Sequence, residues 1–196
     1  MSSDALQRFK QSMNIGYDEW HDGIGYDIEA LSELSDAERQ EAEKLLIPRA
    51  KGDWRDLEAL ERLGTPAATD AILDARKASN PNIRLYALRC GPAPTPEEWE
   101  QSILSALKTG ELFAGLSQVL DCAVEHPSPP VEEALWQKIC DPDSGIAFHC
   151  AAALCCIRGV TKSVYGEKYR PLFLRLVGSD SEDRRKAIEE LAALVK

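Results

Sequence analysis

The fold is decided by a stretch that reads DWRDLEALERLG at residues 53–64. It opens with an aspartate, one of the residue types that cap helix N-termini. It closes with Gly64, placed where a helix should stop. Between these ends, Leu57, Leu60 and Leu63 recur three residues apart and so share one helix face. The stretch therefore predicts a short amphipathic helix with one buried side.

Similar start and stop signals recur along the chain and predict an all-α protein. Ser35 to Glu38 and Thr95 to Glu98 both have the capping-box pattern, a Ser or Thr followed three residues later by Glu. Strand-like alternation is scarce, and residues 160–165, which come nearest to it, are interpreted as a loop. The predicted helices are 35–49, 53–63, 66–78, 81–90, 96–108, 111–125, 130–140, 144–157, 166–177 and 181–195. Their connections are short, so consecutive helices should pack as antiparallel neighbours.

The predicted helices fall into pairs whose second members begin at a repeated spacing. These second helices start near residues 53, 81, 111, 144 and 181, at intervals of about 28 to 37 residues, which is typical of helical repeat proteins. Three of them read DWRDLEALERLG at 53–64, NPNIRLYALRCG at 80–91 and SEDRRKAIEELA at 181–192. In each, a polar cap with Asp or Asn comes first, then Arg, then Ala and Leu at packing positions.

This pattern resembles the HEAT repeat, including the short variety found in bilin-lyase-like proteins, over roughly residues 35–196. The resemblance implies an all-α fold, an α-solenoid of about five antiparallel helix pairs with residues 1–34 as an N-terminal capping segment. It also implies that the Asp or Asn and the Arg of each second helix join neighbouring repeats. In this family the second helices line a concave face that binds partners.

Residues 1–34 precede the repeats and are strongly acidic. They hold seven acidic side chains against Arg8 and Lys10, so their net charge of −5 is half that of the chain. Two interpretations stay open. The aromatic and acidic stretch between Tyr17 and Asp27 covers the end of the repeat array, or it contacts a partner directly. The predicted partner-binding residues, including three that open a second helix beside this stretch, are Tyr17, Asp18, Trp20, Asp22, Tyr26, Asp27, Trp54, Arg55 and Asp56.

The charge of the whole chain narrows the class of partner. Its formal net charge is −10, which repels phosphate backbones and favours a protein with a basic surface over a nucleic acid. Acidity that merely aids solubility is the alternative. Hydrophobic residues make up 44%, enough for a core. No segment has the roughly 20 apolar residues of a membrane span, and the N-terminus lacks a signal-peptide pattern, so we expect a cytoplasmic protein without membrane contact.

No pattern in the sequence predicts catalysis, a metal or a cofactor. The six cysteines, expected to be reduced core thiols, are Cys90, Cys122, Cys140, Cys150, Cys155 and Cys156. They form no Cys-x-x-Cys motif, and the adjacent His149 and Cys150 point to different helix faces. Cys122 and His126 share a helix face but lack an identifiable orienting group. Trp99 and Trp136 are expected to pack between repeats.

In its length, acidity and aromatic-acidic N-terminal segment, the chain is similar to immunity proteins of bacterial toxin systems, including those of type VI secretion. This resemblance implies a binding protein that neutralises a cognate toxin by covering its basic cleft with an acidic concave face. A scaffold or adaptor for other cytosolic proteins is the first alternative. A lyase-like enzyme or chaperone is the second. The oligomeric state is left open.

Overall fold

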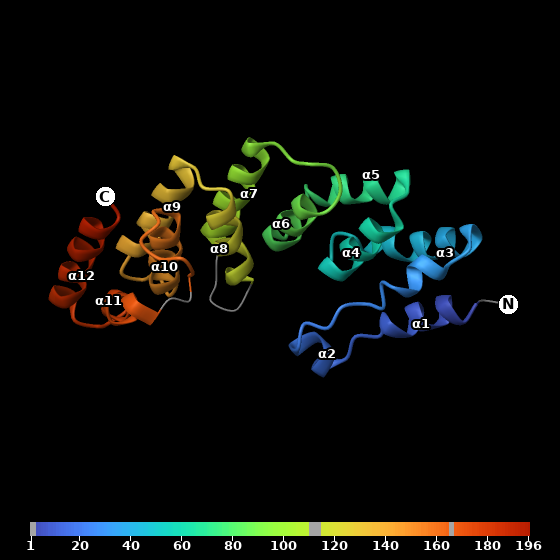
Figure 1. Ribbon diagram of the computed structural model, residues 1–196, viewed down its shortest axis with the longest axis horizontal. Coiled ribbons are helices and arrows are strands. Elements are labelled where there is room, and N and C mark those ends of the chain that lie inside the picture. The colour runs from blue at the N-terminus through green and yellow to red at the C-terminus, as the bar shows by residue number, and fades with distance from the viewer. Residues whose placement is uncertain (1–2, 110–114, 165–166) are drawn as a thin grey trace. The chain divides into compact units, whose positions relative to one another are not determined.

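The computed structural model describes residues 3–109, 115–164 and 167–196, apart from the side chains of Trp20, Thr109 and Glu167. Within these ranges all regular structure is helical (Figure 1), so the predicted all-α class is confirmed. The chain forms two compact units, Met1–Pro94 and Thr95–Lys196. The boundary predicted after residue 34 lies inside the first unit.

The first unit is built from short helices that pack mainly on their sequence neighbours. They are α1 (Asp4–Ser12), α2 (Tyr17–His21), η1 (Ala30–Glu33), α3 (Asp36–Leu46), η2 (Ile47–Arg49), α4 (Trp54–Leu63), α5 (Pro66–Ala75) and α6 (Pro81–Arg89). α3 packs against α4 and α5 against α6, while α4 also contacts α5, α6 and η1. α1 packs against η1. The N-terminal segment therefore shares one core with the first helix pairs, and Phe9, Leu31 and Leu57 are fully buried in it.

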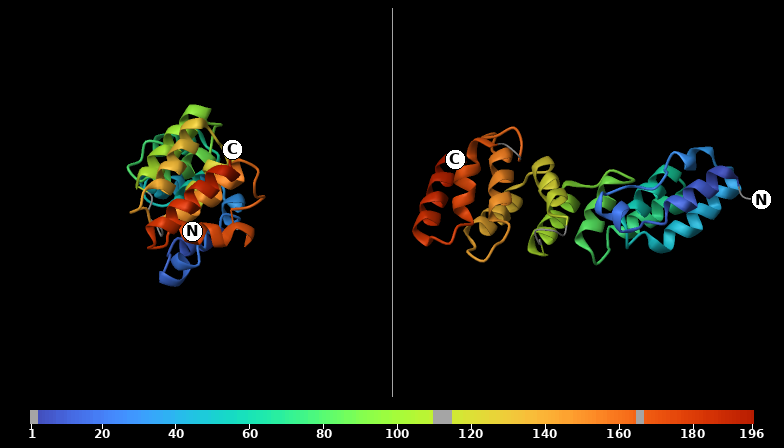
Figure 2. Two further views of the ribbon diagram at one scale, coloured as in Figure 1. Left: turned by 90° about the vertical axis from the view of Figure 1, so that its left-hand side faces the viewer. Right: turned by 90° about the horizontal axis from the view of Figure 1, so that it is seen from below.

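The second unit repeats this arrangement. Its helices are α7 (Pro96–Thr109), α8 (Leu116–Glu125), α9 (Pro129–Cys140), α10 (Ala147–Ile157), η3 (Glu167–Tyr169), α11 (Arg170–Leu176) and α12 (Ser181–Leu194). Consecutive helices pair as α7 with α8, α9 with α10, and α11 with α12. Figure 2 shows the last pair, in red, lying side by side. Corresponding members of neighbouring pairs also meet, since α7 contacts α9 and α8 contacts α10.

Each of the ten predicted helices has an observed counterpart, although several boundaries differ. The predicted starts at residues 111 and 166 fall outside the described residues. The helix predicted over 144–157 begins only at Ala147, after a turn in which the Asp143 amide donates to Asp141 Oδ1 at 3.0 Å. The helix predicted over 53–63 ends as expected at Gly64, whose φ of 63° lies in the left-handed region.

The N-terminal segment contains two α-helices that the sequence patterns did not predict. α1 begins at a Ser3 cap, whose hydroxyl accepts from the Leu6 amide at 3.2 Å. A second contact fixes the start of α1, because the Ser3 amide donates to Glu38 Oε1 at 2.8 Å. Glu38 also closes the predicted capping box of α3 on Ser35. These hydrogen bonds lower the pKa of Glu38 to about 2.

The family resemblance implied that the cap and arginine residues of the second helices join neighbouring repeats, and Arg184 makes a contact of this kind. Asp53, Asn80 and Asp180 cap α4, α6 and α12 with their side chains. Arg84 Nη1 donates to the Ala78 and Ser79 carbonyls, at 2.6 and 2.9 Å. The corresponding arginine of α12 reaches further, because Arg184 Nη2 donates to the Ile139 carbonyl of α9 at 2.8 Å. Its Nε donates to the Leu176 carbonyl at the end of α11, at 2.9 Å.

The cysteines depart from the prediction at one clear position. Cys90, Cys122, Cys150 and Cys155 are buried and Cys156 is half-buried, whereas Cys140 is exposed. Cys140 is the last residue of α9, so it lies at a helix end rather than on the packed face. For the buried thiols, loss of hydration disfavours the thiolate and raises the pKa of Cys150 to about 12.

The carbonyl contacts of Arg184 give the first testable prediction. Arg184→Ala removes two hydrogen bonds from a charged donor and should lower the free energy of unfolding by about 1 to 3 kcal/mol. Arg185→Ala is the matched control. The Arg185 side chain, next in sequence to Arg184, is exposed and pairs with Glu189 on the same helix. That change should cost less than about 0.5 kcal/mol. Urea denaturation of the two variants measures the difference, and equal midpoints would contradict the linking role of Arg184.

Candidate functional site

The stretch from Tyr17 to Asp27, here called the display segment, presents the most exposed of the aromatic side chains that the structure describes in the first unit. Tyr17 is 75% exposed and Ile24 is 50% exposed. The acidic side chains between them, Asp18, Glu19 and Asp22, are also exposed. Apolar and acidic groups therefore occur together on its outer side.

Local hydrogen bonds hold the display segment in a defined turn. The Gly16 amide donates to Glu19 Oε2 at 3.0 Å, which satisfies a donor at the start of α2. At the other end, the Ile24 amide donates to the Glu19 carbonyl at 2.9 Å. Gly23 has a φ of 68°, which supplies the left-handed residue that this type of helix end requires. α2 therefore ends sharply and the chain turns back toward α4.

Arg55 fastens the returning chain to α4. Its side chain is 3% exposed, and its Nε donates to the Ile24 carbonyl at 2.6 Å. Its Nη1 lies 3.3 Å from both carboxylate oxygens of Asp53, so the buried charge is paired. The guanidinium also lies 4.7 Å from the ring centre of Trp54. The exposed Ile24 is thus displayed from a backbone that a buried arginine fixes.

Trp54 packs beside the same turn, near Gly25. Its ring is half-buried and packs on Tyr86 with ring centres 5.4 Å apart. A Cβ atom at Gly25 would lie 4.0 Å from Trp54 Cη2 and 3.4 Å from Glu58 Oε2. Gly25 thus lies within ordinary contact distance of α4 without requiring the absence of a Cβ atom, and Trp54 contributes mainly to this support.

A polar network of the buried Tyr26 and Asp56 with the partly exposed Arg49 secures the end of the display segment. The Tyr26 hydroxyl donates to Asp56 Oδ1 at 3.2 Å and accepts from Arg49 Nη2 at 2.9 Å. Arg49 Nε lies 3.2 Å from Asp56 Oδ1, which completes a three-membered network. The Tyr26 ring packs edge-on against Phe9 of α1. Burial raises the pKa of Asp56, an effect that the Arg49 charge opposes.

Asp27 has a local structural role. Its amide donates to the Ser12 hydroxyl at 2.9 Å, which joins the display segment to the end of α1. Its carboxylate accepts from the Ala30 amide at 3.2 Å and lies 3.6 Å from Arg8 Nε. Through these contacts Asp27 stabilises the start of η1, and its side chain is only partly exposed.

The structure thus separates the predicted binding residues into two groups. Tyr17, Asp18 and Asp22 lie on the surface, where a partner could reach them. Tyr26 and the pair Arg55 and Asp56 are buried, so partner contact is not open to them while the unit is folded. The side chain of Trp20 lies outside the described residues. The inner side of the segment belongs to the core and its outer side is exposed, so both interpretations stay open.

Three contributors to this region were missed by the sequence analysis. Glu19 and Ile24 were overlooked because no periodic pattern distinguishes an exposed residue in a short turn. Arg49 was overlooked because its role depends on the burial of Asp56, seven residues later. The signal was an aspartate on the buried face of α4, since a carboxylate in a core requires a donor or cation nearby.

The parts of the chain that the structure describes contain no cluster of side chains that would form a metal site. Those residues include no group of three or more His, Cys, Asp or Glu side chains placed to hold a metal ion. His126 stacks on Trp99 with ring centres 4.0 Å apart, so its ring packs against an aromatic side chain of α7. None of the described helices combines the length and the apolar character that crossing a membrane requires.

Comparison with known proteins identifies no relative. No protein-family model matches the chain, and no curated protein or solved structure does so either. Function is therefore argued from the geometry described above.

The polar network yields a prediction about stability. Arg49→Ala leaves the buried Asp56 carboxylate without its cation and should lower the free energy of unfolding by about 1 to 3 kcal/mol near neutral pH, less than for a fully buried pair because the Arg49 side chain is 47% exposed. Lys51→Ala is the control, because it breaks only an exposed pair, Lys51 Nζ to Asp74 Oδ2 at 2.6 Å. It should cost less than about 1 kcal/mol.

The pH dependence of the Arg49→Ala deficit provides a second check. Losing Arg49 raises the pKa of Asp56 further above that of the unfolded chain. A carboxyl with a raised pKa in the folded state loses stability as the pH rises through that pKa. The loss of unfolding free energy relative to the wild-type protein should therefore be small near about pH 4.5 and reach its full value by about pH 8. Denaturant titrations at both pH values measure it. A deficit that is independent of pH would place Asp56 outside the network.

Proposed function

We propose that this protein binds a partner protein with a basic surface and that the display segment is one of its contact surfaces. The observation that supports this proposal is the contrast between the two sides of that segment. Its outer side exposes Tyr17, Ile24 and three acidic side chains. Its inner side is held by the Arg55 contact and the Tyr26 network. A surface ordered before binding loses less conformational entropy when the partner docks.

The composition of the display segment favours a protein over other ligands. An exposed tyrosine supplies a large contact area at a low entropic cost. The neighbouring carboxylates increase the rate of encounter with a basic surface and disfavour phosphate-bearing molecules. The net charge of −5 over residues 1–34 concentrates this field in the N-terminal segment.

We further infer that the helix pairs form a HEAT-like α-solenoid. Two features support this inference. Corresponding helices of neighbouring pairs contact each other, namely α4 with α6 and α8 with α10. Arg184 of α12 also donates to the Ile139 carbonyl of α9, which joins two helix pairs. A solenoid would offer an extended surface on which the display segment is a terminal element.

The specific role that we propose is neutralisation of a toxin, in the manner of bacterial immunity proteins. A toxin that acts on an anionic substrate needs a basic cleft, and an acidic protein with apolar anchors is complementary to such a cleft. The most direct test is to co-express this protein with a candidate toxin from a neighbouring gene. The protein should restore growth, whereas a protein that binds without restoring growth would be a scaffold instead.

Charge reversal tests the contact surface itself. Asp18→Lys combined with Asp22→Lys should weaken binding of the partner about tenfold at low salt and flatten the salt dependence of the association rate. Asp27 is left unchanged because of its structural contacts.

The matched control for that experiment is Glu97→Lys combined with Asp143→Lys. Both positions are exposed, both lie in the second unit, and the change in net charge is identical. Calorimetry or surface plasmon resonance would measure the affinities. If both double variants weaken binding by the same factor, the loss of affinity comes from overall charge. The display segment is then not a contact surface.

A further inference from the structure

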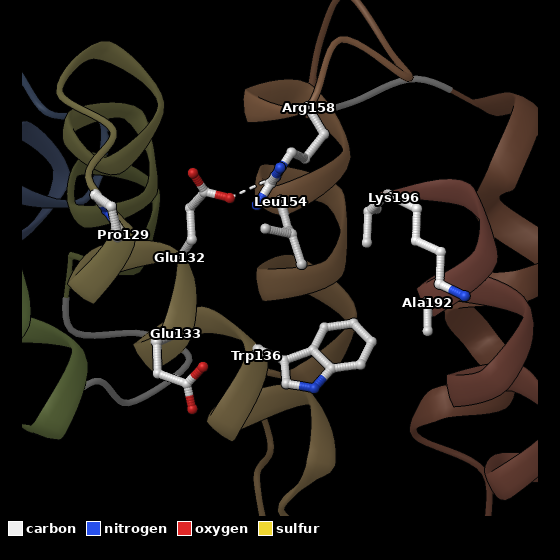
Figure 3. Close-up of a pocket in the computed structure, with 9 residues that line it drawn as sticks. Pro129, Glu132, Glu133, Trp136, Leu154, Arg158, Ala192 and Lys196 are labelled. Carbon is white, nitrogen blue, oxygen red and sulfur yellow. Dashed lines mark hydrogen bonds and ion pairs between the residues drawn. The ribbon is translucent and has the colours of Figure 1, made fainter.

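The second unit contains a cavity of about 420 Å³ between α9, α10 and the C-terminal end of α12. Its apolar wall consists of Trp136, Leu154, Ala192 and Val195. Figure 3 shows the Trp136 ring extending from α9 toward Ala192, with Leu154 above it. The sequence analysis assigned Trp136 to packing between repeats. The structure places it half-buried between the α9–α10 pair and α12 of the next pair, on the wall of an open cavity.

The size of this cavity limits what it can accept. Ligand pockets in proteins are typically about 300 to 1,000 Å³, so this one is at the small end of the range. It suits one large or two small apolar side chains rather than a whole helix. A half-buried tryptophan in such a hollow is the residue type that most often contributes strongly to protein binding.

The two glutamates on the rim of the cavity differ in their partners. Glu132 on α9 and Arg158 on α10 form an ion pair, with Nε and Oε2 separated by 2.5 Å (Figure 3). Glu133 is exposed and accepts a hydrogen bond from the uncharged Gln137 amide at 3.2 Å. In this view Glu133 and Lys196 lie on opposite sides of the Trp136 ring. A cation entering beside Glu133 would therefore gain a carboxylate partner and the face of an indole ring.

The charges around the cavity differ between its two sides. Residues 95–146, which include α9, carry a net charge of −8, whereas residues 158–196, which supply Arg158 and the α12 wall, carry +3. A basic group is therefore favoured on the α9 side of the cavity, beside Glu133.

We propose that the α9–α10–α12 cavity receives an apolar side chain of the basic protein partner, flanked by a lysine or arginine that pairs with Glu133. This inference rests on the proposed function and adds a second contact point, in the other compact unit. It specifies the local chemistry of the partner segment as alternating basic and apolar residues.

The test uses short peptides as probes, so that it does not require the partner. One acetylated and amidated peptide reads Lys-Leu-Lys-Phe-Lys-Leu-Lys. In a second peptide Glu replaces every Lys, and in a third Ser replaces every apolar residue. Binding to the full chain is followed by the indole N–H signals in ¹H–¹⁵N spectra, with the Trp136 signal assigned from Trp136→Phe. Only the first peptide should shift that signal appreciably.

Two variants identify the contacts. Trp136→Ala should weaken binding of the first peptide at least about fivefold, and Glu133→Lys should do the same. Glu97→Lys, an exposed position on α7 that does not line the cavity, changes the net charge equally and should leave binding within about twofold. Because Trp136→Ala can also loosen α9, the exposed Glu133 substitution provides an independent result.

Three outcomes would overturn the proposal. The glutamate peptide could bind as well as the lysine peptide, the serine peptide could shift the same signal, or Glu133→Lys and Glu97→Lys could weaken binding equally. These failures are distinguishable from failure of the proposed function. A partner that still binds fully to the Trp136→Ala protein refutes the cavity alone. Loss of every protein partner with intact peptide binding refutes the proposed function alone.

Discussion

The architecture depends on hydrogen bonds from arginine side chains to main-chain carbonyl groups. Short helices expose a large fraction of their backbone at their ends, and the last four carbonyls of each have no partner within the helix. Arg184 supplies such partners from α12 to the end of α11 and to α9. Arg55 does the same from α4 to the display segment. One residue type, placed near the start of the second helix, thus satisfies the backbone and fixes neighbouring segments.

The same constraint explains why the display segment can be both a cap and a contact surface. Arg55 and the Tyr26 network need the inner side of the segment, and their burial excludes water from it. The side chains that remain outside, such as Tyr17, have no part in this core. The inner side chains of this stretch therefore stabilise the fold, while the outer ones, which include the proposed contact residues, can vary without loss of the fold.

Helix positions could be predicted from the sequence because caps and apolar spacing are local signals. Asp53 and Gly64 bracket α4 whatever surrounds it. The role of Tyr26 could not be predicted in the same way, since an aromatic residue is equally suited to a core or an interface, and only tertiary packing distinguishes the two. α1 was missed because its buried Leu6 and Phe9 stand among polar residues in a segment judged by its charge.

The distribution of charge bears on whether the acidity has a function. If acidic residues served only solubility, their excess should be spread along the chain. Residues 35–94 instead carry ten acidic and ten basic side chains and are neutral overall. Residues 1–34 carry −5 and residues 95–146 carry −8, while residues 158–196 carry +3. The two negative stretches contain the display segment and the α9 wall of the Trp136 cavity. The display segment combines this excess with the exposed Tyr17 and Ile24, and the α9 wall combines it with the half-buried Trp136. Other exposed apolar side chains, such as Leu73 and Leu174, lie in stretches without an acidic excess. The segregation of charge is therefore the feature that solubility alone leaves unexplained and that the proposed recognition of a basic partner would account for.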